Sequence, residues 1–127
     1  TDSMLAAHMD DINAVFGGHD VIAIRSQLDV HDALLATFPR MAGGMAAGSP
    51  IALAATVALV RAVRDAPTME TALDMEYRFT HRWLASTDFV EGVRAAVIDK
   101  DHAPHWRHDD VAAVPPALIV DLLAPLD

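Results

Sequence analysis

Three histidines near the C-terminal end form the densest group of side chains in the chain that could bind a metal or transfer a proton. The group, with the two carboxylates that follow it, is His102, His105, His108, Asp109 and Asp110. Imidazole and carboxylate groups are common ligands of zinc and other transition metals. Pro104, however, prevents the regular helix that would align the three rings. We therefore expect a solvated loop here, and we assign no metal ligand.

Other potentially catalytic or phosphate-binding residues lack the spacing or sequence context that their chemistry requires. Glu76 and His81 are five residues apart, which places them about 140° from each other around a helix. No serine lies in the G-x-S-x-G context of a nucleophile elbow, and Ser49 before Pro50 is better explained as a helix cap. No glycine-rich loop follows a strand, so a phosphate-binding loop is not indicated. Taken alone, the residues indicate a helical domain and no catalytic residue.

Composition argues against several classes of partner. The 18 acidic and 9 basic residues give a formal net charge of -9, which repels the phosphates of nucleic acids. The most apolar stretch, residues 51–63, contains Arg61 and is shorter than the roughly 20 residues that a membrane span needs. The chain has no cysteine, which is compatible with the cytoplasm. We expect a cytoplasmic protein that binds neither nucleic acid nor a membrane.

The elements that must carry these residues are helices. With 127 residues, 53% hydrophobic content and only 6% aromatic residues, the chain favours a single all-α domain over residues 1–127. We expect about six helices plus a short helical tail. The first covers residues 3–16, Asp20 caps the second, and a third stretch over residues 31–47 should break at Pro39.

The fourth helix should be the centre of the core, because it is apolar nearly all round. The residues expected to cap the last three helices are Ser49, Thr68 and Asp88. The fifth helix should extend to about residue 86. Asp88 and Glu91 have the spacing of a capping box that opens the sixth helix, which should end at residue 97 or 98. Pro115-Pro116 splits the tail into two short apolar turns.

Three segments are more informative than the single residues, namely SPIAL at 49–53, ALDMEYRFTHR at 72–82 and DFVEGVRAAVIDKDHAPHW at 88–106. Together they resemble the C-terminal region of enzymes of the crotonase (enoyl-CoA hydratase/isomerase) superfamily, in its 3-hydroxyisobutyryl-CoA hydrolase branch. The superfamily pattern D-x-x-E-G-x-x-A occurs at Asp88, Glu91, Gly92 and Ala95. Enoyl-CoA hydratases typically continue with A-F-x-E-K-R-x-P-x-F. This chain continues as AAVIDKDHAPHW, which is similar to the hydrolase branch.

The resemblance implies a longer α/β crotonase-fold chain, of which residues 1–127 are the helical C-terminal region. In the family, this region covers the acyl-CoA pocket or packs on another subunit of a homo-oligomer. The oxyanion-binding amides and catalytic carboxylates lie in the preceding catalytic region. No position here matches them, so we expect the isolated chain to be inactive.

The implied activity is hydrolysis of the 3-hydroxyisobutyryl-CoA thioester in valine catabolism. No cofactor is implied, because coenzyme A is part of the substrate. One alternative is an enoyl-CoA hydratase/isomerase of the same superfamily. The other is a helical interaction module without catalysis, which an independent promoter and a stop codon immediately upstream would favour.

Lys100 is the only lysine and follows the sixth expected helix. The resemblance implies that it contacts the phosphates of CoA, since crotonase relatives have a lysine just after the equivalent helix. A solvated ion pair with Asp99 or Asp101 is the alternative. One residue more separates Gly92 from Lys100 than in the hydratase pattern, which would rotate the lysine by about 100° in a continuous helix.

Overall fold

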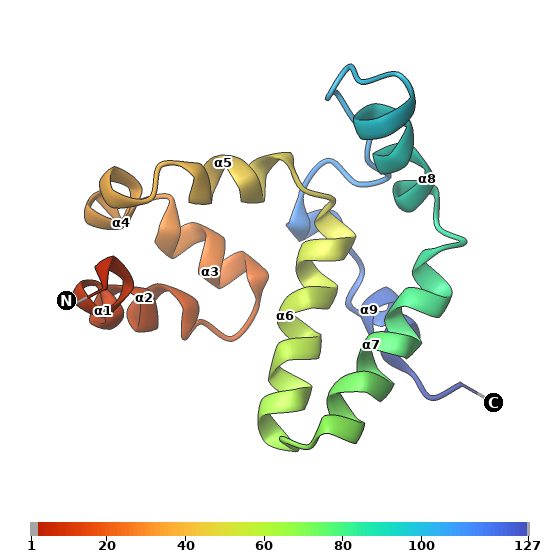
Figure 1. Cartoon of the computed structure of the whole chain (residues 1–127), viewed down its shortest axis with the longest axis horizontal. Coiled ribbons are helices and arrows are strands. Elements are labelled where there is room, and N and C mark those ends of the chain that lie inside the picture. Colours follow the sequence, from red (N-terminus) through yellow and green to blue (C-terminus); the bar gives the residue numbers. More distant parts are fainter. Residues whose placement is uncertain (1–2, 127) are drawn as a thin grey trace. The chain divides into compact units, whose positions relative to one another are not determined.

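The computed structural model describes residues 3–126, which fall into two compact units that divide between Gly48 and Ser49. Helices are the only regular secondary structure in the described residues, so the all-α prediction is confirmed. Nine α-helices occur in this part of the chain, because two of the expected helices are each broken in two (Figure 1). The single helical domain expected for residues 1–127 stays a prediction, and the two units are described separately.

The first unit contains five short helices. They are α1 (Met4–Ala7), α2 (Met9–Phe16), α3 (Val21–Leu28), α4 (Asp32–Thr37) and α5 (Arg40–Ala47). Asp20 caps α3 as predicted, since its Oδ1 accepts a hydrogen bond from the backbone N–H of Ala23 at 2.9 Å. The break expected at Pro39 is also confirmed, because this residue separates α4 from α5.

The helix expected over residues 3–16 is interrupted at His8, whose backbone (φ -114°, ψ 17°) is not helical. The His8 imidazole lies 3.3 Å from the hydroxyl of Thr37 in α4, and 3.4 Å from the carboxylate of Asp11. A contact between residues 29 positions apart is not visible in helical periodicity. The core of this unit consists of the buried aliphatic residues Val15, Val21, Ile24, Leu28 and Leu34.

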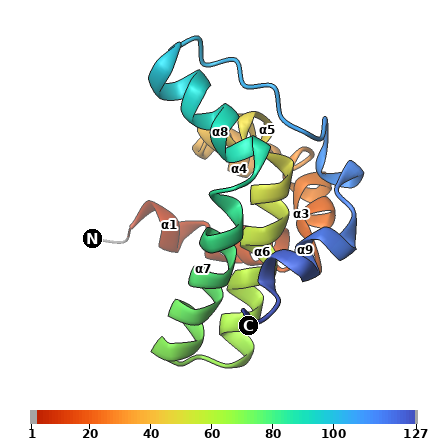
Figure 2. The same ribbon diagram turned by 90° about the vertical axis from the view of Figure 1, so that its right-hand side faces the viewer.

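Three helices pack against one another in the second unit. They are α6 (Pro50–Asp65), α7 (Met69–Trp83) and α9 (Pro116–Leu123). Figures 1 and 2 show α6 and α7 side by side, with α9 next to both. Ser49 and Thr68 cap α6 and α7 as predicted, each accepting a hydrogen bond from the amide three residues later. The core of this unit comprises Ile51, Val114 and Leu122, with Phe79 and Trp83 stacked beside them.

Helix α6 is buried only in its first turns, so the expectation of a fully enclosed core helix is met in part. Its buried residues are Pro50, Ile51 and Ala55, whereas Val60 is 59% exposed. Its packing partners within the unit are α7, α9 and the 3-10 turn η2 (Val111–Ala113). None of the described helices alone is both long and apolar enough to cross a membrane; α5 and α6 reach that length and hydropathy only when counted together.

Helix α8 (Thr87–Val93) begins two residues earlier than a cap at Asp88 would place it. Its cap is Ser86, whose Oγ accepts a hydrogen bond from the backbone N–H of Phe89 at 3.2 Å. The predicted capping box of Asp88 and Glu91 is therefore wrong, because both residues lie inside the helix. Helix α7 accordingly ends at Trp83, before the expected residue 86.

A π-helical turn, η1 (Arg94–Ile98), continues α8 without a break. Within it, the backbone N–H of Asp99 donates to the carbonyl oxygen of Arg94 at 2.8 Å, which is the i→i+5 bond of a π-helix. The helical segment thus ends at residue 98, as expected. Residues 99–110 form an irregular connection to η2 and α9, which make up the predicted tail.

Candidate functional site

The surface of α8 and η1 that faces the following loop is built from side chains three residues apart. Asp88, the first of them, is only 2% exposed. Its Oδ1 accepts a hydrogen bond from the backbone N–H of Arg107 at 2.8 Å, and its Oδ2 accepts one from the hydroxyl of Ser49 at 2.5 Å. A buried carboxylate requires such donors, since it has left water. Asp88 therefore ties the loop to the first turn of α6.

Glu91 lies one turn farther along and binds both the loop and the next helical turn. Its Oε1 accepts a hydrogen bond from the backbone N–H of His105 at 2.8 Å. The Arg94 guanidinium binds the same carboxylate through two N–H donors, at 2.7 and 2.9 Å. The bond from Arg94, and then that from His105, lower the pKa of Glu91 from 4.5 to about 2. Glu91 is thus ionised at neutral pH.

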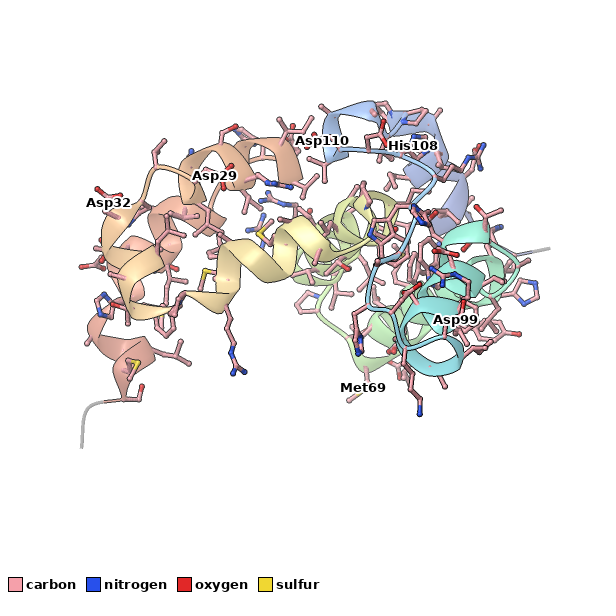
Figure 3. All side chains as sticks on the ribbon, turned by 90° about the horizontal axis from the view of Figure 1, so that it is seen from above. Asp29, Asp32, Met69, Asp99, His108 and Asp110 are labelled. Carbon is pink, nitrogen blue, oxygen red and sulfur yellow. The ribbon has the colours of Figure 1, made fainter. Side chains whose placement is uncertain are left out.

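Arg94 is the third of these side chains, three residues after Glu91, and it binds three groups of the loop. Its Nη1 donates to Asp99 at 2.7 Å and to Asp101 at 2.6 Å, and its Nη2 donates to the carbonyl oxygen of Ala103 at 3.3 Å. The bonds from Glu91, Asp101 and Asp99 raise the pKa of Arg94 further above its ordinary value. The Arg94 guanidinium, in turn, lowers the pKa of Asp101. In Figure 3, Asp99 lies beside the ribbon turn where η1 ends.

Two small residues on the same surface let the loop come close. A Cβ atom at Gly92 would meet the ring of Trp106 at 3.4 Å. Ala95 is 2% exposed, and its carbonyl oxygen accepts a hydrogen bond from the backbone N–H of His102 at 3.1 Å. Each position of the D-x-x-E-G-x-x-A pattern therefore contacts or supports the loop. The repeated spacing of 88, 91 and 94–95 on one helix face was the signal for this role, and the capping interpretation missed it.

Lys100, the second residue of this loop, has a backbone conformation that residues with a Cβ rarely adopt. Its φ is 56°, and His102 has φ 53°; these are the two non-glycine residues of the described part with positive φ. Lys100 is exposed, and none of the described carboxylates lies within ion-pair distance of it. The alternative considered for Lys100, an ion pair with Asp99 or Asp101, does not form, because both carboxylates bind Arg94. The helix does not continue through Lys100, so a rotation of about 100° does not apply.

The three histidines do not come together. His102 and His105 are exposed and His108 is half-buried, farther along the chain in Figure 3. No group of three or more His, Asp or Glu side chains in residues 3–126 is arranged to hold a metal ion. The ring of His81 lies 5.8 Å from that of Tyr77, and Glu76 is exposed. In the described part of the chain, the clearest arrangement is therefore a helix that holds a loop containing one exposed lysine.

Comparison with known proteins identifies the family of this chain. The family model described as enoyl-CoA hydratase/isomerase matches residues 1–123. The mitochondrial 3-hydroxyisobutyryl-CoA hydrolase of Gallus gallus is 30% identical over 125 residues, which cover 97% of this chain and 31% of that protein. The human protein of the same name is 33% identical over 112 residues, which cover 87% of this chain and 28% of that protein.

Solved structures show the same relationship. An enoyl-CoA hydratase from Rhodobacter sphaeroides 2.4.1 superposes with a TM-score of 0.89 at 40% identity, covering 99% of this chain and 36% of that one. A carnitinyl-CoA dehydratase from Mycobacterium thermoresistibile gives a TM-score of 0.83 at 36% identity, covering 100% of this chain and 36% of that one. The chain spans about a third of the length of these relatives. It belongs to the enoyl-CoA hydratase/isomerase family, also called the crotonase superfamily.

Proposed function

We propose that this chain is the helical part of an acyl-CoA-processing enzyme that hydrolyses a thioester, with 3-hydroxyisobutyryl-CoA as the substrate. The curated relatives at 30 and 33% identity carry that name. The observation that carries the proposal is the loop of residues 99–110, which Asp88, Glu91 and Arg94 bind and which contains the exposed Lys100. Hydration of an enoyl-CoA is the second candidate, because the similar solved structures are those of an enoyl-CoA hydratase and a carnitinyl-CoA dehydratase.

The reacting groups would come from a catalytic region that lies outside the third of the relatives' length to which this chain corresponds. Thioester hydrolysis needs donors that stabilise the charge on the thioester oxygen, and a carboxylate that activates water or forms an acyl-enzyme. Asp88 and Glu91 do not suit the second task, because their oxygens already accept hydrogen bonds from Ser49, Arg107, His105 and Arg94. A pKa of about 2 also makes Glu91 a weak base at neutral pH.

The role we propose for Lys100 is binding of the CoA phosphates. An ammonium group is a compact cation on a flexible stem, which suits a phosphate. Lys100 is exposed, and its acidic neighbours are occupied by Arg94. We propose further that no separate cofactor takes part, that the enzyme is cytoplasmic, and that its partners are the catalytic region and other copies in a homo-oligomer.

The first experiment identifies the reaction. This chain, joined to the catalytic region of its own gene, is supplied in turn with 3-hydroxyisobutyryl-CoA and with an enoyl-CoA. Hydrolysis releases a free thiol that a thiol reagent detects, whereas hydration consumes the enoyl group and releases none. Thiol release from the first substrate supports the hydrolase, and loss of the enoyl group alone supports the hydratase. Turnover by the isolated 127-residue chain would contradict the assignment of the chemistry to the catalytic region.

The second experiment tests Lys100 in the same joined protein. Lys100→Ala should raise KM for the acyl-CoA about fivefold and leave kcat nearly unchanged, because a contact present throughout the reaction contributes only uniform binding of about 1 kcal/mol. Steady-state kinetics at low ionic strength measure this, since salt screens an exposed contact. An unchanged KM under those conditions would refute the phosphate contact.

A further inference from the structure

We propose that Arg94 is a positioning residue for coenzyme A: it binds Asp99 and Asp101 on either side of Lys100 and so keeps the ammonium free for the phosphates. The inference rests on the proposed function of Lys100. It adds a residue that does not touch the ligand and acts only through the loop. Three observations support it, namely the competition for the two carboxylates, the backbone conformation of Lys100, and the separation of Arg94 from the core.

The first observation is electrostatic. Asp99 and Asp101 flank the lysine in the sequence, and either would attract its ammonium and repel a phosphate. The guanidinium of Arg94 binds both, at 2.7 and 2.6 Å. Arginine suits this task because its planar fork has several fixed donors, whereas an ammonium is a single point of charge. Arg94 carries one positive charge and also binds Glu91, so it does not cancel the charges of Asp99 and Asp101. Its hydrogen bonds occupy both carboxylates, however, and Lys100 forms an ion pair with neither.

The second observation is conformational. Lys100 and His102 both adopt left-handed backbone geometry, which persists only where the surroundings enforce it. The enforcing contacts lie on both sides of Lys100. Asp99 binds Arg94 before it, and after it Asp101 binds Arg94 and also accepts a hydrogen bond from Ala103 N–H at 2.9 Å. Loss of Arg94 would remove its bonds to both flanking carboxylates, so we expect the backbone at Lys100 to lose its fixed conformation and the side chain its fixed direction.

The third observation is that the contact is separable from the fold. The Arg94 side chain is 28% exposed. It is not part of the core of this unit, which consists of Ile51, Val114, Leu122 and their neighbours. The later residues of the loop are held independently of Arg94, since Asp88 binds the amide of Arg107 and Glu91 binds that of His105. Loss of Arg94 should therefore release residues 99–103 and leave the rest of the unit folded.

The test is a double-mutant cycle in the joined protein, with kcat and KM measured for the acyl-CoA. Arg94→Ala should raise KM roughly two- to fivefold with kcat unchanged, which is no more than the effect of Lys100→Ala. The variant that carries both substitutions should match Lys100→Ala alone, because Arg94 acts through Lys100. Arg94→Lys retains the charge and the stem but cannot bridge both carboxylates. It should therefore show a smaller rise in KM, and it serves as the test if Arg94→Ala does not fold.

Two controls separate positioning from other effects. Arg64→Ala removes the same charge from an exposed arginine that pairs with Asp65 in α6, and it should leave KM unchanged. The same acyl group on pantetheine, which lacks every phosphate, should give equal KM values for the wild type, Arg94→Ala and Lys100→Ala.

Each contrary result has a distinct meaning. If Lys100→Ala raises KM and Arg94→Ala does not, the inference about Arg94 is wrong and the role of Lys100 stands. Additive effects in the double variant, or a lower kcat with the pantetheine thioester, would give Arg94 an independent or merely structural role and overturn the inference. An unchanged KM in Lys100→Ala refutes the proposed phosphate contact itself, and the inference fails with it.

Discussion

Replacement of Asp88 by alanine is the most direct test of how the loop is attached. The carboxylate is 2% exposed and accepts hydrogen bonds from the hydroxyl of Ser49 and from the backbone N–H of Arg107. Each hydrogen bond to a charged acceptor contributes about 1.5–3 kcal/mol, and removal of the acceptor leaves both donors without a partner. The relief of a buried charge offsets part of this loss. We expect Asp88→Ala to reduce the free energy of unfolding by about 2–4 kcal/mol.

Thermal unfolding of the 127-residue chain measures this effect. At an unfolding entropy of about 2.1 cal/mol/K per residue, a loss of 3 kcal/mol lowers Tm by roughly 10 °C. Asp88→Asn retains an acceptor for Arg107 and a donor for Ser49, so it should cost only about 1 kcal/mol. Asp109→Ala, an exposed aspartate on the same connection, should have almost no effect.

The difference between the two variants of Asp88 is the decisive quantity. If Asp88→Ala lowers Tm no more than Asp109→Ala does, the carboxylate does not hold the loop. If Asp88→Asn is as destabilising as Asp88→Ala, the negative charge matters rather than the two hydrogen bonds. Amide hydrogen exchange at Arg107 gives an independent measure, because its protection should fall with the loss of the acceptor.

Two further predictions concern acid and the core. Glu91 has its pKa lowered from 4.5 to about 2, so its contribution to stability is present above pH 4.5 and is lost as the pH falls to about 2. Trp106 fluorescence should change over that range in the wild type and much less in Glu91→Gln; an equal response in both would refute this. Ile51→Ala should cost about 2–4 kcal/mol in denaturant unfolding, whereas Val60→Ala, at 59% exposure, should cost less than about 0.5 kcal/mol. Equal costs at the two positions would contradict the partial burial of α6.

The sequence predicted the features that depend on local chemistry. Ser49, Thr68 and Asp20 cap helices as expected, since each side chain satisfies an amide that its own helix leaves open. The i,i+4 spacing of Asp74 and Arg78 on one helix likewise predicts an ion pair, and the structure contains it. These contacts involve residues at most four positions apart, and the types of the two residues are sufficient to predict them.

The features that were missed depend on residues distant in the sequence or on competing local contacts. Asp88 has the spacing of a cap, but it binds Ser49, 39 positions away, while Ser86 caps the helix. The two carboxylates beside Lys100 bind Arg94, although the lysine is closer in sequence. The resemblance to crotonases identified the family correctly. The way in which the D-x-x-E-G-x-x-A pattern holds the loop emerged only from the coordinates.

The π-helical turn η1 has a consequence for how members of this family can differ in length. An i→i+5 turn contains one residue more than an α-helical turn. The chain has one residue more between Gly92 and Lys100 than the hydratase pattern, and η1 lies within that interval. A π-helical turn can hold one additional residue as a local bulge, so we expect an insertion at this point to leave the preceding helix in place. In a regular α-helix, the same additional residue would rotate the following loop by about 100°.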